Sequence, residues 1–346
     1  MKENEIIFQA INIKKEFDVT VALKGADITL KRGEIRGLIG ENGSGKSTII
    51  DEILEHCTSL TVLRDGEIMG ELTKEDMQKS DIANKIRYLM IGREMTGDYY
   101  RSDYDSVCSE VSRLSFQHVT FGRIKDFNLE VHAGEIVGIG GLSGCGMHEI
   151  GRAGYGLEKL IEGKVLCDGK IVKSCKDAIK YGIGYISKNR DTEALILNGS
   201  IQDNIVLPSL PDLQKGIYIS KKSEHMLSDK EIERFHIKCA DGNQWVNTLS
   251  GGNKQKVSFA KWTAKGANII IMDCPTRGVD VGVKQFMYQQ IMEMKKAGNA
   301  ILMISEELTE LIGMSDRLLI MKDFEISGQF KRSSGLKPAD MINYMV

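Results

Sequence analysis

Hydrophobic and polar positions in the first part of the chain predict short strands interrupted by one helix. Residues 6–13 alternate apolar and polar side chains, as a half-buried strand does, whereas residues 35–39 form a continuous apolar run typical of a buried strand. A helix is expected after residue 45, because Ile49, Ile50, Ile53 and Leu54 would form a single stripe. Further strands, the last two joined in a hairpin around Asp65-Gly66, are expected at 21–30, 60–63 and 67–72.

The rest of the chain repeats this opening and then alternates strands with helices. Strands are expected at 116–121, 127–131, 136–139, 182–186, 269–272 and 300–304. Helices are expected at 221–238, at 286–296, and from Gly251 to about Lys265, with Ser250 as the capping residue. Strands that alternate with helices favour a mainly parallel sheet covered by helices on its faces.

Two stretches of sequence recur, at different offsets. Gly33-Glu34-Ile35 returns 101 positions later as Gly134-Glu135-Ile136, and residues 63–67 return 258 positions later as 321–325. The difference between these offsets predicts that the first copy lacks 157 residues present in the second. We therefore expect a truncated first domain at 1–95, a linker at 96–112 and a complete second domain at 113–346.

Composition narrows the class of protein. A chain of 346 residues can form two domains, and its net charge of −2, with the signs interleaved, argues against a nucleic-acid partner. The seven cysteines form no CxxC pair, so neither a zinc motif nor a disulfide framework is indicated, and a reduced compartment fits best. The histidines, including His148, match no metal-binding spacing. Neither a leader segment nor a membrane-spanning apolar run is expected.

Residues 40–47 carry the strongest chemical signal. They fit G-x-x-x-x-G-K-[ST], a glycine loop between a strand and a helix whose backbone N–H groups surround phosphate oxygens. Lys46 would reach the terminal phosphates of a nucleotide, and the Ser47 hydroxyl would bind Mg²⁺. The corresponding loop of the second copy, 138–149, has neither a lysine nor the hydroxyl that follows it.

A second signal lies at 249–257, where Ser250 and two glycines precede a helix. Such a helix start can hold a phosphate, although by itself it could equally be an ordinary capped helix. The phosphate loop and the strand that ends at Asp273 favour the functional interpretation.

With these motifs the chain resembles the tandem-cassette ATP-binding proteins of ABC importers for simple sugars such as ribose, galactose and xylose. Residues 249–257 resemble the family signature LSGGNQQKV, 273–282 resemble DEPTRGIDVG, 184–190 resemble GYVPEDR, and 92–94 match GRE. The resemblance implies an α/β P-loop NTPase fold with an antiparallel β subdomain and a helical subdomain, duplicated and with the first copy incomplete.

The resemblance also assigns residues to ATP and Mg²⁺. Phe17 matches the aromatic residue that stacks on adenine, and Ser47 and Asp273 match the groups that support Mg²⁺. Val279-Asp280 matches the D-loop. The phosphate loop and the signature residues of the nucleotide site correspond to Gly40, Glu41, Asn42, Gly43, Ser44, Gly45, Lys46, Ser47, Thr48, Ser250, Gly251 and Gly252.

Several departures from the family pattern concern catalysis. Cys274 stands where the catalytic glutamate is expected, and a thiol cannot polarise water as a carboxylate does. Glu306 stands at the switch position, which has no histidine, and Lys188-Asn189 replaces an acidic pair. Lys46 and Asp273 belong to different copies. No catalytic residue is therefore assigned from the sequence, and hydrolysis is expected to be weak or lost.

Two functions remain open at this point. The first is the ATP-binding, energy-coupling component of a sugar importer, peripheral on the cytoplasmic face of the cell membrane. Its partners would be transmembrane permease subunits, with a second cassette in cis or in a homodimer. The alternative is a catalytically inactive nucleotide-binding regulatory paralogue or a decayed gene product.

Overall fold

The chain divides into two compact units. The computed structural model describes residues 5–17, 20–39, 54–64, 67–79, 82–91, 99–104, 108–216 and 218–345. The first unit comprises residues 1–99 with 278–284, and the second comprises residues 100–277 with 285–346. No helix in the described ranges is both long enough and apolar enough to cross a membrane.

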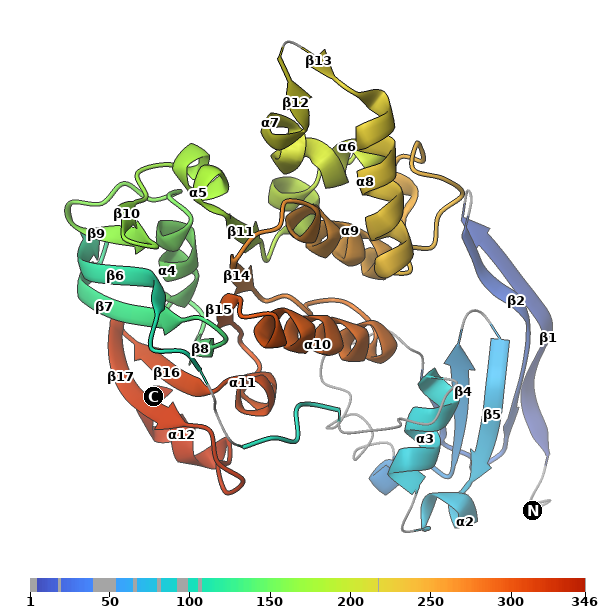
Figure 1. The fold of residues 1–346 in the computed structure, drawn as a ribbon. Helices are drawn as coiled ribbons and strands as arrows, with labels where there is room; N and C mark the ends of the chain where they lie inside the picture. The colour runs from blue at the N-terminus through green and yellow to red at the C-terminus, as the bar shows by residue number, and fades with distance from the viewer. Residues whose placement is uncertain are drawn as a thin grey trace. The chain divides into compact units, whose positions relative to one another are not determined.

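The first unit holds two small sheets (Figure 1). Strands β1 (Ile6–Phe17) and β2 (Thr20–Lys31) form an antiparallel hairpin. The second sheet has the order β3-β4-β5, in which β3 runs parallel to β4 and β5 antiparallel to it. The strands are β3 (Arg36–Ile39), β4 (Ser59–Arg64) and β5 (Glu67–Thr73). Two helices follow them in the chain, α2 (Lys74–Met77) and α3 (Ile82–Ile91).

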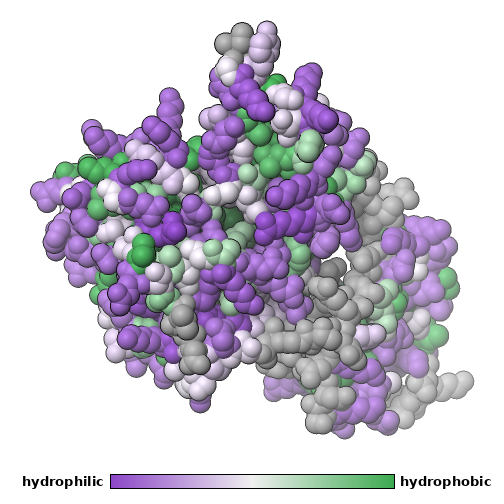
Figure 2. Space-filling view, viewed as in Figure 1, coloured by the Kyte–Doolittle hydropathy of each residue, from purple (hydrophilic) through white to green (hydrophobic). Residues whose placement is uncertain are grey.

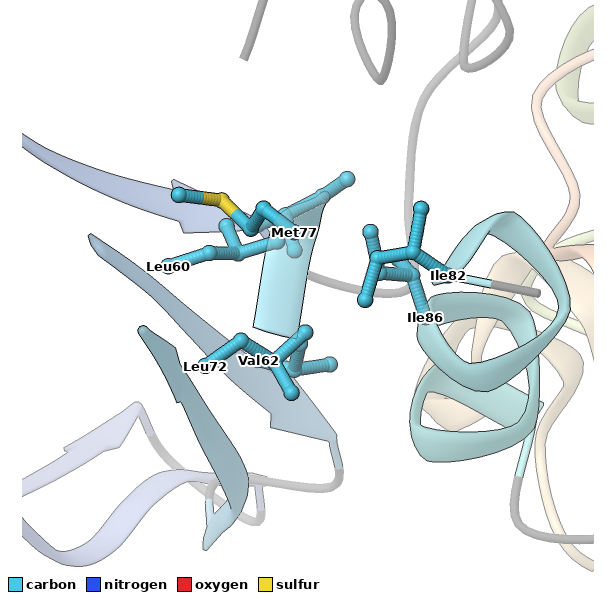
Figure 3. Close-up of a cluster of buried hydrophobic side chains, with 7 residues drawn as sticks. Leu60, Val62, Leu72, Met77, Ile82 and Ile86 are labelled. Carbon is cyan, nitrogen blue, oxygen red and sulfur yellow. The ribbon is translucent and has the colours of Figure 1, made fainter. Parts of the chain in front are cut away.

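A small apolar cluster holds this second sheet to its helices. Leu60, Val62 and Leu72 point from β4 and β5 toward Ile82 and Ile86 of α3 (Figure 3). The same cluster includes Ile39 and Met77, with Leu54 and Leu89 packed against it. The apolar side chains of β4 thus lie on one face of the sheet, and α3 covers that face, as is usual for a strand with this pattern.

The second unit is built on a six-stranded sheet with the order β11-β14-β15-β8-β16-β17. Its strands run parallel except β17, which pairs antiparallel with β16. Every residue of β8, β11, β14 and β15 is buried, as expected for parallel strands covered on both faces. The strands are β8 (Ile136–Gly141), β11 (Ile183–Ile186), β14 (Ile269–Asp273), β15 (Ala300–Ile304), β16 (Arg317–Lys322) and β17 (Glu325–Lys331).

Helices lie on both faces of this sheet. On one face α4 contacts β8, β14 and β15, and on the other Leu311 of α11 lies against Gly138 and Gly140 of β8. Nine α-helices are described in this part of the chain, and α10 begins in residues that are assigned to the first unit. They are α4 (Met147–Gly154), α5 (Cys175–Tyr181), α6 (Ile201–Val206), α7 (Leu210–Leu213), α8 (Lys221–Arg234), α9 (Gly251–Ala264), α10 (Val281–Lys296), α11 (Leu308–Met314) and α12 (Ala339–Met345).

An antiparallel sheet with the order β10-β9-β6-β7 and a two-stranded hairpin complete the second unit. Helices α6, α8 and α9 contact one another and form its helical part. The face shown in Figure 2 is mostly hydrophilic over the second unit, with hydrophobic residues in scattered groups. The strands are β6 (Ser112–Phe121), β7 (Ile124–His132), β9 (Glu162–Cys167), β10 (Lys170–Ile171), β12 (Gln214–Lys215) and β13 (Tyr218–Ile219).

The strand pairing of the first unit recurs in the second, residue for residue. Arg36 of β3 lies opposite Ser59 of β4, and at the two sequence offsets this pair becomes Val137 of β8 opposite Arg317 of β16. The following hairpin keeps its register too, with an irregularity after Val62 in β4 and at the equivalent position in β16. In the second unit β15 pairs with the other side of β8, whereas in the described part of the first unit β3 is an edge strand.

Most predicted elements are present, with bounds shifted by a few residues. Strand β15 and the start of α9 lie where the sequence predicts them, and Ser250 caps α9 by accepting a hydrogen bond from Asn253 N. The start of the helix expected after residue 45 lies outside the described residues, and residues 54–56 are helical. In the segment expected to be a linker, Arg101 is buried in the second unit against Asp316, while the domain boundaries themselves stay a prediction.

Candidate functional site

The carboxyl ends of the parallel strands in the second unit meet around one cluster of polar side chains. It consists of His148, Tyr185, Lys188, Asp273, Cys274 and Glu306, and we call it the strand-end cluster. His148 lies in the first turn of α4, and the other members lie in or just after β11, β14 and β15. This edge is where open α/β sheets place their ligands.

The loop between β8 and α4 has the strand–loop–helix path of a phosphate loop but is filled by apolar neighbours. A Cβ atom on Gly141 would lie 2.4 Å from the Cys145 sulfur, and one on Gly146 would lie 2.8 Å from the Phe324 ring. Gly146 has a φ of 102°, which favours glycine. Met147 occupies the position of Lys46 at the offset of 101, and its side chain is fully buried.

His148 occupies the position equivalent to Ser47 at the same offset. Its Nδ1 lies 2.7 Å from Asp273 Oδ1, and the Tyr185 hydroxyl donates to Asp273 Oδ2 at 3.3 Å. Asp273 is buried. Burial disfavours the charged imidazole, but the hydrogen bond and negative charge of Asp273 outweigh it and raise the pKa of His148. The spacing of the histidines in the sequence gives no sign of this contact, because the fold brings His148 to a carboxylate 125 positions away.

Lys188 and Glu306 form the outer part of the strand-end cluster. Lys188 Nζ lies 2.8 Å from Glu306 Oε1 and 3.1 Å from His148 Nε2. Glu306 Oε1 is in turn 3.5 Å from His148 Nε2. The hydrogen bond from Lys188 holds the pKa of Glu306 below its usual value. Glu306, the residue at the switch position, is thus engaged by a lysine from the segment after β11.

Cys274 lies at the inner end of the cluster. It is buried, and burial raises the pKa of its thiol to about 12. Its φ of 49° lies in the left-handed region, which non-glycine residues seldom adopt. A general base must accept a proton from the attacking water, and a neutral thiol does not do so. Cys274 therefore does not serve as a general base here.

These residues do not fit Mg²⁺ and a nucleotide in the second unit. Mg²⁺ prefers oxygen ligands, but an imidazole and a thiol accompany the one carboxylate of Asp273. Met147 offers no positive charge to phosphate, and the Lys188 ammonium is bonded to Glu306. The strand-end cluster therefore lacks the groups that phosphoryl transfer needs.

The other predicted site residues are distributed over both units. Ser250 is exposed at the N-terminus of α9, where its hydroxyl also accepts a hydrogen bond from the Asn253 side chain at 3.0 Å. Phe17 ends β1, with its backbone paired to Thr20. The phosphate loop 40–48, including Lys46 and Ser47, lies outside the described residues, so its assignment to a nucleotide stays a prediction.

One buried carboxylate near the strand ends was missed by sequence reasoning. Glu310 of α11 accepts hydrogen bonds from the hydroxyls of Thr276, Tyr288 and Ser305. No local pattern marks these four residues, which come from four segments. His148, by contrast, could have been found from the repeat, because the offset of 101 that pairs Lys46 with Met147 also pairs Ser47 with His148.

Comparison with known proteins gives a consistent family assignment. Residues 23–97 and 124–277 match the sequence model of the family described as ABC transporter. The match in two segments is consistent with a partial, duplicated cassette.

Several curated relatives of this chain are ribose import ATP-binding proteins, named RbsA. The protein of Bacillus licheniformis is 39% identical over 91% of this chain and 63% of its own length. Those of Clostridium tetani and Bacillus subtilis are 37% and 35% identical, over 82% and 92% of this chain and 55% and 61% of their own lengths. This chain thus spans less than two thirds of each of these relatives.

Solved structures support the fold alone. A dimeric ATP-binding cassette in a post-hydrolysis state with ADP and Pi superposes with a TM-score of 0.56 at 22% identity, covering 64% of this chain and 99% of that chain. A nucleotide-free cassette from an ABC transporter gives a TM-score of 0.57 at 19% identity, covering 68% and 95%.

Proposed function

This chain belongs to the ABC transporter family, and we propose that it is an ATP-binding component of an importer for ribose or a related simple sugar. The observation that carries the proposal is the likeness to ribose import ATP-binding proteins over 82% to 92% of the chain. In this role it would act at the cytoplasmic face of the membrane, under transmembrane permease subunits. A second cassette, in this chain or in another copy, would complete the nucleotide site.

We further propose that the first cassette has lost its middle. The register of β3, β4 and β5 matches that of β8, β16 and β17, while the described first unit contains no counterparts of β11, β14 and β15. ATP would bind in the first unit, with Phe17 on the adenine and residues 40–48 around the phosphates. Ser47 would hold Mg²⁺, which supplies charge neutralisation at the phosphates.

A specific observation favours the second candidate, a nucleotide-binding protein without hydrolytic activity. In the strand-end cluster Cys274 replaces a carboxylate, and Lys188 is held by Glu306. Next to the cluster, Met147 replaces a lysine. The two candidates differ in whether the chain works with transmembrane permease subunits. We propose that hydrolysis is weak or absent in either case, because several charge-stabilising groups are missing and each can be worth about 10²–10³ in rate.

ATP binding is tested with the full chain and a fluorescent ATP analogue in the presence of Mg²⁺. We expect Lys46→Ala to weaken binding about ten- to a hundredfold, the range for losing a hydrogen bond to a charged group. Lys188→Ala is the matched control in the second unit and should leave the affinity unchanged. Equal affinity for wild type and Lys46→Ala would refute binding at the first unit, and a loss confined to Lys188→Ala would move the site to the second.

Hydrolysis is tested by steady-state phosphate release from the same proteins. Wild type should stay near the level of Lys46→Ala. Cys274→Glu alone should not raise it, because Met147 and His148 still occupy the lysine and hydroxyl positions. Robust turnover in wild type that Lys46→Ala abolishes would show that the chain holds a complete catalytic site.

A further inference from the structure

Three side chains of the strand-end cluster bring different donor atoms to one point. A nitrogen of His148, a carboxylate oxygen of Asp273 and the sulfur of Cys274 all lie within 4.8 Å of one another. Asp273 and Cys274 are buried, and His148 is partly buried. In a tetrahedral zinc site the ligand atoms lie roughly 3–4 Å apart. The widest separation here would therefore close by up to about 1 Å, and His148 Nδ1 and Asp273 Oδ1, now 2.7 Å apart, would open slightly to admit the ion.

The donor set is one that selects a borderline or soft divalent cation. Imidazole and thiolate favour Zn²⁺ over Mg²⁺, and a carboxylate is an accepted third ligand of zinc. Charge also balances at this point. A dication would meet the carboxylate of Asp273 and the thiolate of Cys274, while Lys188 and Glu306 neutralise each other at 2.8 Å.

The surroundings would orient the ligands. With His148 Nδ1 turned to Asp273, the other ring nitrogen lies 3.1 Å from Lys188 Nζ and 3.5 Å from Glu306 Oε1. When the ion binds, Glu306 would accept from this nitrogen, as in the carboxylate–histidine pairs that support zinc. The Tyr185 hydroxyl donates to the second oxygen of Asp273. Glu306 and Tyr185 are therefore placed as outer partners of the ligands, and a water molecule would supply the fourth ligand.

We propose that His148, Asp273 and Cys274 form a binding site for a transition-metal dication of the zinc type, at the place where related folds would hold a nucleotide. On binding, the Cys274 sulfur loses its proton to solvent and becomes a thiolate ligand, with no change of oxidation state. The ion ties the start of α4 to the end of β14 and so stabilises the second unit. The proposal does not depend on ATP binding by the first unit.

Cobalt titration of the full reduced chain tests the site, because Co²⁺ substitutes for Zn²⁺ and reports thiolate ligands by a charge-transfer absorption. We expect one Co²⁺ per chain with this band, displaced by Zn²⁺ and insensitive to excess Mg²⁺. Cys274→Ser should remove the band, and His148→Asn should weaken binding by at least about tenfold. Zn²⁺ should raise the melting temperature of wild type, followed by the fluorescence of Trp245 and Trp262, and of neither variant.

Cys145→Ser is the matched control. Cys145 is buried, as Cys274 is, and lies just before α4, the helix that carries His148, but it is not part of the donor set. It should bind Co²⁺ as wild type does. A chain that binds no Co²⁺, or a band that persists in Cys274→Ser, overturns the proposal and leaves a metal-free ion pair of His148 with Asp273. If Cys274→Ser fails to fold, His148→Asn tests the proposal instead, and unchanged Co²⁺ affinity in that variant overturns it.

Discussion

At the scale of single residues, Asp316 shows how the second unit surrounds a buried carboxylate with partners. One oxygen of its buried carboxylate lies 2.6 Å from Arg101, and the other lies 2.8 Å from Lys295 and also accepts from Ile136 N. Arg101 also bonds Asp103. Sequence spacing gives no sign of this arrangement, because Arg101 and Asp316 are separated by most of the chain.

Replacing Arg101 should therefore cost much more than its position in a predicted linker suggests. We expect Arg101→Met to lower the free energy of unfolding of the second unit by about 3–5 kcal/mol, because it removes one partner of a buried charge. Urea unfolding followed by tryptophan fluorescence measures this, since both tryptophans lie in the second unit. Arg113→Met, which removes an exposed pair with Asp168, should cost less than about 1 kcal/mol. Equal losses would contradict the account.

Lys261 gives the second unit a dependence on alkaline pH. Its amino group donates to Ala194 O, and burial lowers its pKa to about 8 from 10.5. The nearby acids are engaged elsewhere, Glu193 by Ser187 and Asp212 by Lys265. Between these two pKa values the unfolded chain holds a proton that the folded chain has released, so stability rises with pH in that window.

Relative to Lys261→Met, wild type should thus gain about 2 kcal/mol of unfolding free energy between pH 7 and pH 9.5. Urea unfolding at the two pH values measures the gain, and Lys265→Met serves as the control at the end of the same helix. A difference between wild type and Lys261→Met that does not change with pH would show that the ammonium is not desolvated in the folded state.

At the scale of elements, Ser250 has two predicted roles at the N-terminus of α9, as the capping residue and as part of the nucleotide site. Ser250→Ala should destabilise the second unit by about 1 kcal/mol, because the hydroxyl that accepts from Asn253 N is lost. Ser174→Ala, which removes the equivalent cap from α5, should cost a similar amount in the same urea experiment. A loss of nucleotide affinity with Ser250→Ala but not with Ser174→Ala would separate ligand binding from capping.

Elements with strong local signals could be predicted from the sequence, and those formed by long-range packing could not. The apolar runs of β14 and β15 are long, continuous and flanked by helices, so their pattern is unambiguous. Helix α3 was not predicted, because its apolar residues become a face only when Ile82 and Ile86 meet β4. The strand-end cluster was predicted only in part, since the sequence marks Asp273, Cys274 and Glu306 but not the contacts of His148, Tyr185 and Lys188.

At the scale of the whole molecule, the two units differ in how completely they cover their sheets. In the second unit β8 is flanked by β15 and β16, whereas β3 has only β4 in the described part of the chain. Both units have large apolar side chains that are more than half exposed, but in the smaller first unit they gather on β1 and at β3: Ile6, Ile7, Phe8, Ile11, Ile35 and Leu38. Contiguous exposed apolar surface is typical of an interface or of a protein that aggregates.

This difference should be visible when the chain is divided. A fragment of residues 100–346 should stay soluble and unfold cooperatively, because it keeps Arg101 against Asp316 and Tyr100 against Gly313. A fragment of residues 113–346 loses both contacts and should be less stable by about 3–5 kcal/mol. A fragment of residues 1–99, with its apolar side chains exposed and without residues 278–284, should aggregate or be partly unfolded. Calorimetry and analytical ultracentrifugation of the three fragments measure these outcomes. If residues 1–99 instead melt sharply as a monomer, the first unit folds independently, and the proposal that it is an incomplete cassette with uncovered apolar surface is wrong.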